Sequence, residues 1–128
     1  MSISMKELNP KGYPTSPVID ANLKILHERM NELRQIWGKP MIITSGLRSD
    51  EQQMELIKAG KSKAIASKHL AGMACDVYDP DKELAKWCLA NEDILRRIGL
   101  WCEHPDYTRN WVHLQITPPK SGKRFFIP

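Results

Sequence analysis

The chain has 128 residues, of which 41% are hydrophobic and 27% are charged, and its net charge is +4. This balance fits one compact domain spanning residues 1–128 and excludes a low-complexity chain. The mildly basic charge suits an anionic partner, either a bacterial cell wall or a nucleic acid, and selects neither. Because no run of 18 apolar residues occurs and the N-terminus has no apolar signal region, we expect no membrane span and cytoplasmic synthesis without a signal peptide.

The first half of the chain is predicted to be mainly helical. Residues 1–15 have no periodic pattern and are predicted to form an irregular N-terminal arm. A long amphipathic helix is predicted from Ser16 to Gly38, because Ser and the Pro that follows it favour a helix start and apolar residues recur at steps of three and four. Three elements follow it: a short buried strand, a second helix and a lysine-rich loop, over residues 41–44, 49–59 and 61–68.

The second half alternates strands with short helices. Strands are predicted over residues 74–78, 100–103 and 112–116, and helices from Asp79 through Cys88 and over residues 92–98. The tail, residues 117–128, is predicted to be irregular, with its last apolar residues packing back onto the body. A short loop joins the last two strands, which favours an antiparallel pair. We therefore predict an α+β domain in which helices pack on a small, mainly antiparallel sheet.

The three cysteines, Cys75, Cys88 and Cys102, are widely spaced. No CxxC pair is present, which argues against a cysteine zinc ribbon. We expect all three to be buried reduced thiols, since free cysteine is among the most buried residue types. On a strand, alternation would point Cys75 away from the face that carries Asp76.

Three side chains could form a metal site. His69 and Asp76 lie seven residues apart, and His113 is far along the chain. Two imidazoles and one carboxylate are a set that a catalytic zinc uses when it keeps its fourth position open for water. On the strand predicted around His113, the imidazole would lie on one face of the sheet and the side chains of the neighbouring residues on the other face, in the core. His27, beside the apolar stripe of the long helix, is expected to be structural.

Three motifs in the chain occur in a characteristic order. They are SGLRSDEQQ from Ser45, SxHxxGxAxD from Ser67 to Asp76, and WxH ending at His113. Together they resemble the signatures of the zinc D-alanyl-D-alanine carboxypeptidase and endolysin group, which shares its fold with the Hedgehog signalling domain. Ordered motifs that carry a ligand mechanism are more specific than any one of them alone.

This resemblance implies roles for six of the matching residues. It implies one Zn²⁺ held by His69, Asp76 and His113, with Arg48 stabilising the scissile carbonyl as it becomes an oxyanion. It also implies substrate contacts at Ser67 and Gln53. The substrate class that it implies is the peptide of peptidoglycan, cut by a carboxypeptidase or an endopeptidase.

The chain departs from the group at the general base. Many members carry Glu three residues before the last His, where this chain has Asn110, which cannot accept a proton. Three acceptors nearby could replace it, namely Glu103, His104 and Asp106. We favour Glu103, because its strand is predicted to lie beside the strand that carries His113.

The sequence is compatible with three functions. The first is a monomeric zinc peptidase acting on peptidoglycan, released to the wall by phage lysis or carried on a virion. The second is a wall-binding or structural module of the same fold that has lost turnover, which Asn110 suggests. The third, a nucleic-acid-binding domain, is disfavoured because no recognised binding motif accompanies the basic charge.

Overall fold

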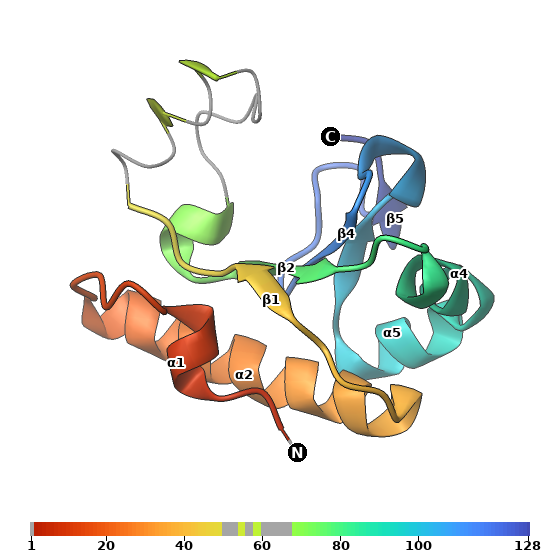
Figure 1. The fold of residues 1–128 in the computed structure, drawn as a ribbon, viewed down its shortest axis with the longest axis horizontal. Coiled ribbons are helices and arrows are strands. Elements are labelled where there is room, and N and C mark those ends of the chain that lie inside the picture. The colour runs from red at the N-terminus through yellow and green to blue at the C-terminus, as the bar shows by residue number, and fades with distance from the viewer. Residues whose placement is uncertain (1, 50–53, 56–57, 60–67) are drawn as a thin grey trace.

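The computed structural model describes residues 2–49, 54–55, 58–59 and 68–128. A five-stranded sheet in the order β1-β2-β4-β3-β5 is packed against helices, as the α+β prediction requires (Figure 1). The strands are β1 (Ile43–Ser45), β2 (Ala74–Tyr78), β3 (Trp101–Glu103), β4 (Trp111–Gln115) and β5 (Phe125–Phe126). All neighbouring pairs are antiparallel except β3 with β5, which is parallel.

The long helix α2 (Pro17–Trp37) follows the sequence prediction closely. Its start is capped by the Ser16 side chain, which accepts a hydrogen bond from the Ile19 amide. Gly38 ends it in the left-handed conformation at φ 80°, where glycine carries no side-chain penalty. Its buried stripe is Leu23, Leu26, Met30 and Leu33.

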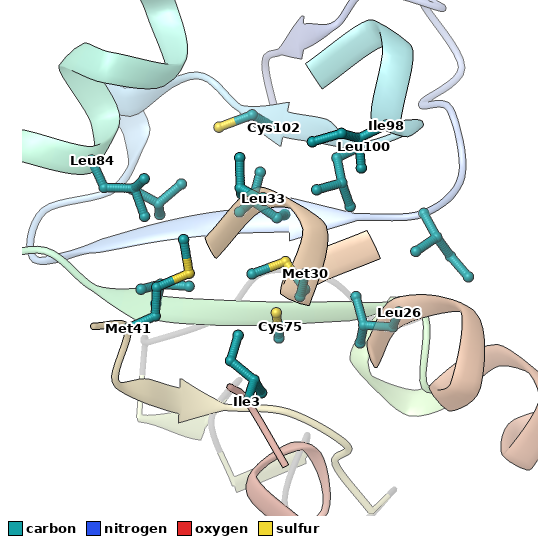
Figure 2. Close-up of a cluster of buried hydrophobic side chains, with 14 of the residues drawn as sticks. Ile3, Leu26, Met30, Leu33, Met41, Cys75, Leu84, Ile98, Leu100 and Cys102 are labelled. Atoms are coloured by element: carbon teal, nitrogen blue, oxygen red, sulfur yellow. The ribbon is translucent and has the colours of Figure 1, made fainter. Parts of the chain in front are cut away.

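The core lies between the helices and one face of the sheet. Figure 2 shows Leu26, Met30 and Leu33 of α2 gathered with side chains from the strands and from the smaller helices. Alternation along β2 and β4 supplies the sheet side of this core with Cys75, Val77, Val112 and Leu114, all of them buried. Asp76 and His113 consequently lie on the opposite face.

Two short helices complete the packing, α4 (Glu83–Ala90) and α5 (Glu92–Ile98). The start of α4 is held by Asp79, whose carboxylate accepts from the amides of Leu84 and Ala85 at 3.0 and 2.9 Å. Gly99 ends α5 at φ 92° and lets the chain turn directly into β3. The helix α5 confirms the one predicted over residues 92–98. The helix predicted from Asp79 exists as α4 but begins at Glu83.

The N-terminal arm is not irregular, so that prediction was wrong. It contains a short helix, α1 (Met5–Leu8), and it buries Ile3 and Leu8 in the core. The side chain of Asn31 on α2 accepts from the Ile3 amide at 2.6 Å and donates to the Ile3 carbonyl at 2.9 Å. His27 is structural as predicted, with its Nε2 2.8 Å from the same carbonyl oxygen.

Two other predictions need adjustment. The strand predicted over residues 41–44 begins two residues later, because Met41 enters the core while Ile42 faces solvent with 63% of its surface exposed. The tail is not wholly irregular, since β5 pairs with β3 and buries Phe126. Most of the predicted second helix and lysine-rich loop lies outside the described residues. Within the described part of the chain, no helix is long and apolar enough to cross a membrane.

Candidate metal centre

Three elements bring His69, Asp76 and His113 together. His69 lies in the short 3₁₀ helix η1 (Lys68–Ala71), Asp76 in the middle of β2 and His113 in the middle of β4. Asp76 and His113 are directly paired in the antiparallel register. One ligand atom from each of the three residues lies within 4.8 Å of the others. The two rings contact each other edge to face, with their centroids 5.2 Å apart.

The imidazole of His69 is oriented by the backbone. Its Nδ1 lies 2.8 Å from the Gly46 carbonyl oxygen, which can only accept, so Nδ1 carries the proton. The other nitrogen, Nε2, then faces Asp76 Oδ1 at 3.3 Å. Gly46 can reach this place because it has no side chain, as a Cβ there would stand 2.2 Å from the Leu8 carbonyl oxygen. The N-terminal arm, through Leu8, therefore packs against the segment whose carbonyl orients His69.

Asp76 is shared by three partners. Its Oδ1 faces both imidazoles, with His113 Nδ1 at 3.0 Å, and its Oδ2 accepts from Arg48 Nη2 at 3.4 Å. Burial opposes ionisation, but His69 and His113 outweigh it and hold the pKa of Asp76 well below its usual range. Burial likewise opposes the charged form of His113, yet its hydrogen bond with Asp76 and that carboxylate's charge raise the pKa of His113. The aspartate is therefore an anion, as a metal ligand must be.

Arg48 lies against this carboxylate, with 13% of its side chain exposed. Its Nε donates to Ser45 Oγ at 3.1 Å, and its amide donates to the His69 carbonyl oxygen at 3.2 Å. Burial lowers the pKa of Arg48, an effect that the charge of Asp76 opposes. The guanidinium, the residue predicted to act on a scissile carbonyl, is thus fixed beside the three possible ligands.

The donor set fits a zinc ion. One nitrogen of each imidazole and one carboxylate oxygen converge, and these are the atoms that zinc prefers in catalytic sites. The outer nitrogen of each ring is also engaged, His69 with Gly46 and His113 with Gln115, as is usual for metal-ligating histidines. His69, Asp76 and His113 are therefore the residues that would hold the metal.

Glu103 lies on the same side of the sheet as the cluster. Trp101 and Cys102 of β3 pair with Gln115 and Leu114 of β4, so the next step of the register brings Glu103 beside His113. Partial burial raises the pKa of Glu103; the charge of His113 lowers it and that of Asp76 raises it. Of the three acceptors named from the sequence, Glu103 is the one whose strand pairs with the strand that carries His113.

The other two candidate bases are engaged with each other. His104 Nδ1 accepts from the Asp106 amide at 3.2 Å and lies 3.6 Å from that residue's carboxylate. The Asp106 side chain is 84% exposed. Asn110 is exposed, and its carbonyl accepts from the Asp79 amide at 2.7 Å.

Two predicted substrate residues, Ser67 and Gln53, lie outside the described residues. Three residues that the sequence reasoning did not single out for the site belong to its surroundings: Gly46, Gln115 and Phe126. The ring of Phe126 meets that of His113 edge to face at 6.0 Å between centroids. Gln115 could have been predicted from the sequence, because residues two apart on a strand lie on the same face and Gln115 follows His113 by two.

Comparison with known proteins places this geometry in a family. No curated protein sequence matches the chain. Among solved structures, a Serratia marcescens protein described as the L-Ala D-Glu endopeptidase ChiX has a similar fold, with a TM-score of 0.54 and 22% identity over 85% of this chain and 93% of its own. The sequence profile described as Peptidase M15 matches residues 3–115, which include all three candidate ligands. The chain therefore belongs to the peptidase M15 family.

Proposed function

We propose that this chain is a zinc-dependent peptidase that hydrolyses the stem peptides of peptidoglycan. Its family indicates a metallopeptidase. The observation that carries the proposal is the convergence of two imidazoles and a carboxylate within 4.8 Å, beside an arginine and a glutamate that are both partly buried. The substrate class is supported by the endopeptidase with a similar fold, and by the net positive charge of the chain, which suits an anionic wall.

The proposed mechanism assigns one task to each side chain. A zinc ion held by His69, Asp76 and His113 would supply Lewis-acid chemistry, which makes water a nucleophile near neutral pH. Glu103 accepts the proton that the attacking water loses, and later delivers a proton to the leaving amine. Arg48 directs a fixed positive charge towards the carbonyl oxygen on which negative charge develops.

A second function, a wall-binding module without turnover, is favoured by one observation. Asn110 occupies the position where many related enzymes carry their base, and its side chain cannot take up a proton. Glu103 supplies a carboxylate on a neighbouring strand, which is the reason that we rank the enzyme first. The two functions differ in whether covalent bonds of the substrate are broken.

The test is digestion of purified peptidoglycan by the zinc-loaded protein, with mass spectrometry of the released fragments. We expect fragments whose new termini identify the bond cut, and no fragments after chelation of the metal or with His113→Ala. His27→Gln is the matched control, because His27 contacts the Ile3 carbonyl oxygen outside the cluster. Undigested peptidoglycan with the fully zinc-loaded protein would support the inert module, and cleavage by metal-free protein would refute both the zinc requirement and the mechanism.

A further inference from the structure

The imidazole of His113 is connected to the C-terminal segment by a chain of hydrogen bonds. Its Nε2 lies 2.9 Å from Gln115 Oε1, and Gln115 Nε2 donates to the Thr117 carbonyl oxygen at 2.8 Å. Gln115 is 3% exposed, so water does not compete freely for its amide. Thr117 lies beyond residues 3–115, the part of the chain that matches the family. One end of this series of hydrogen bonds, at Thr117, therefore lies outside the region that matches the family.

The direction of these bonds is fixed at the Thr117 end. A carbonyl oxygen can only accept, so the amide nitrogen of Gln115 must face Thr117 and its oxygen must face His113. That oxygen also only accepts, so His113 Nε2 must carry a proton. In the neutral ring Nδ1 then holds the lone pair. This nitrogen lies 3.0 Å from Asp76 Oδ1. In the protonated ring a second proton joins these two atoms, and a metal ion bound to both would take the place of that proton.

We propose that Gln115 is a positioning residue that fixes the tautomer of His113, presenting Nδ1 to the metal. The inference rests on the zinc site of the proposed function and is independent of its peptidase activity. Without Gln115, the proton can move to Nδ1 and form a hydrogen bond with Asp76, which occupies both ligand atoms. Partners of this kind typically change metal affinity by about 10–100-fold.

The decisive variant is Gln115→Met, which has a similar length but no acceptor. We expect its zinc affinity, measured by competition with a chromophoric chelator, to fall by about 10–100-fold. In metal-free protein at a pH where the ring is neutral, ¹⁵N NMR of the imidazole is expected to show the proton on Nε2 in the unaltered chain and on Nδ1 in the variant.

Thr117→Ala is the matched control, because it removes the side chain and leaves the carbonyl that the argument uses. Unchanged zinc affinity in Gln115→Met, or a proton on Nδ1 in the unaltered metal-free chain, would overturn the proposal. The second measurement needs no variant, so it decides the matter even if Gln115→Met does not fold. Neither measurement uses substrate. Failure to cleave peptidoglycan would therefore count against the proposed function and leave this inference standing.

Discussion

At the scale of single residues, Asp76 is the side chain on which the others depend. Its two oxygens contact different neighbours: Oδ1 faces the two imidazoles, and Oδ2 accepts a hydrogen bond from Arg48. This division keeps the carboxylate ionised and fixes its orientation before any metal arrives. Because such pre-organisation lowers the cost of binding, the site requires little rearrangement to take up a cation.

The role of Glu103 can be tested by Glu103→Gln, which preserves the shape of the side chain and removes its capacity to accept a proton. We expect the rate of peptide cleavage to fall by about 10²–10⁴-fold. Zinc content, measured by elemental analysis, is expected to stay unchanged because Glu103 is not a ligand. Asp106→Asn is the control and should cleave at the original rate. The opposite pattern, with Asp106→Asn impaired and Glu103→Gln active, would move the base to Asp106.

Gly46 permits the close approach of its own backbone to that of Leu8, and the variant Gly46→Ala tests the importance of this approach. The added methyl group would stand 2.2 Å from the Leu8 carbonyl oxygen. We expect a loss of about 1–3 kcal/mol in the free energy of unfolding, measured by urea denaturation. Zinc affinity should also fall, because the Gly46 carbonyl orients His69.

The control for this variant is Gly122→Ala, where nothing lies within 4 Å of the added methyl group. Since Gly122 has φ +72°, alanine there should cost about 1–2 kcal/mol from backbone strain alone. Its zinc affinity should not change. Equal zinc affinities in the two variants would show that the contact between Gly46 and Leu8 has no influence on His69.

At the scale of elements, the parallel strand β5 joins the C-terminal segment to the site. Its Phe126 is 8% exposed and contacts the ring of His113, whereas the next residue, Ile127, is 69% exposed. We expect Phe126→Ala to lower the free energy of unfolding by about 3 kcal/mol, as for other buried aromatic residues. Ile127→Ala should change it by about 0.5 kcal/mol or less. Thermal unfolding of the two variants side by side measures the difference, and equal melting temperatures would mean that β5 does not hold the sheet edge.

Elements with a strong periodic pattern could be predicted from the sequence, and those fixed by single contacts could not. The stripe of α2 and the alternation of β2 carry their own structural signal, so both were predicted closely. The arm has just two buried apolar residues, Ile3 and Leu8, and its docking depends on Asn31, 28 residues away from Ile3. Contacts between distant polar groups leave no periodic trace in a sequence.

The candidate site follows the same division. The ligand residues could be proposed because their types and motif spacing reflect the chemistry of zinc. The link from His113 through Gln115 to Thr117 could not, because it depends on strand register and on which atom of an amide faces which partner. The pairing of β3 with β4 was predicted correctly, since two strands joined by a short loop tend to pair. The role of Glu103 stays a prediction.

At the scale of the whole molecule, the sheet separates two environments. The core side contains three free, buried thiols, those of Cys75 and Cys102 on the sheet and that of Cys88 on α4. Burial raises the pKa of the Cys88 thiol to about 12 and that of Cys102 well above its usual value. Thiolate, the reactive form, is therefore scarce in the native protein.

We accordingly expect no reaction of the native protein with a thiol reagent at neutral pH on the time scale of mixing. In denaturant, all three thiols should react. Reaction in native conditions should proceed only as fast as the protein opens. Zinc bound as proposed would stabilise the folded state and slow the reaction further. One thiol that reacts at once in the native protein would show that the core face is open to solvent.

The course of the last strand has a practical consequence for anyone who produces this protein. Pro128 follows Phe126 by two residues, and Phe126 lies against the His113 ring. At about 3.5 Å per extended residue, whatever is joined after Pro128 starts within reach of the candidate ligands. A polyhistidine purification tag at that end would introduce competing imidazoles beside the site, so tags are better placed at the opposite terminus.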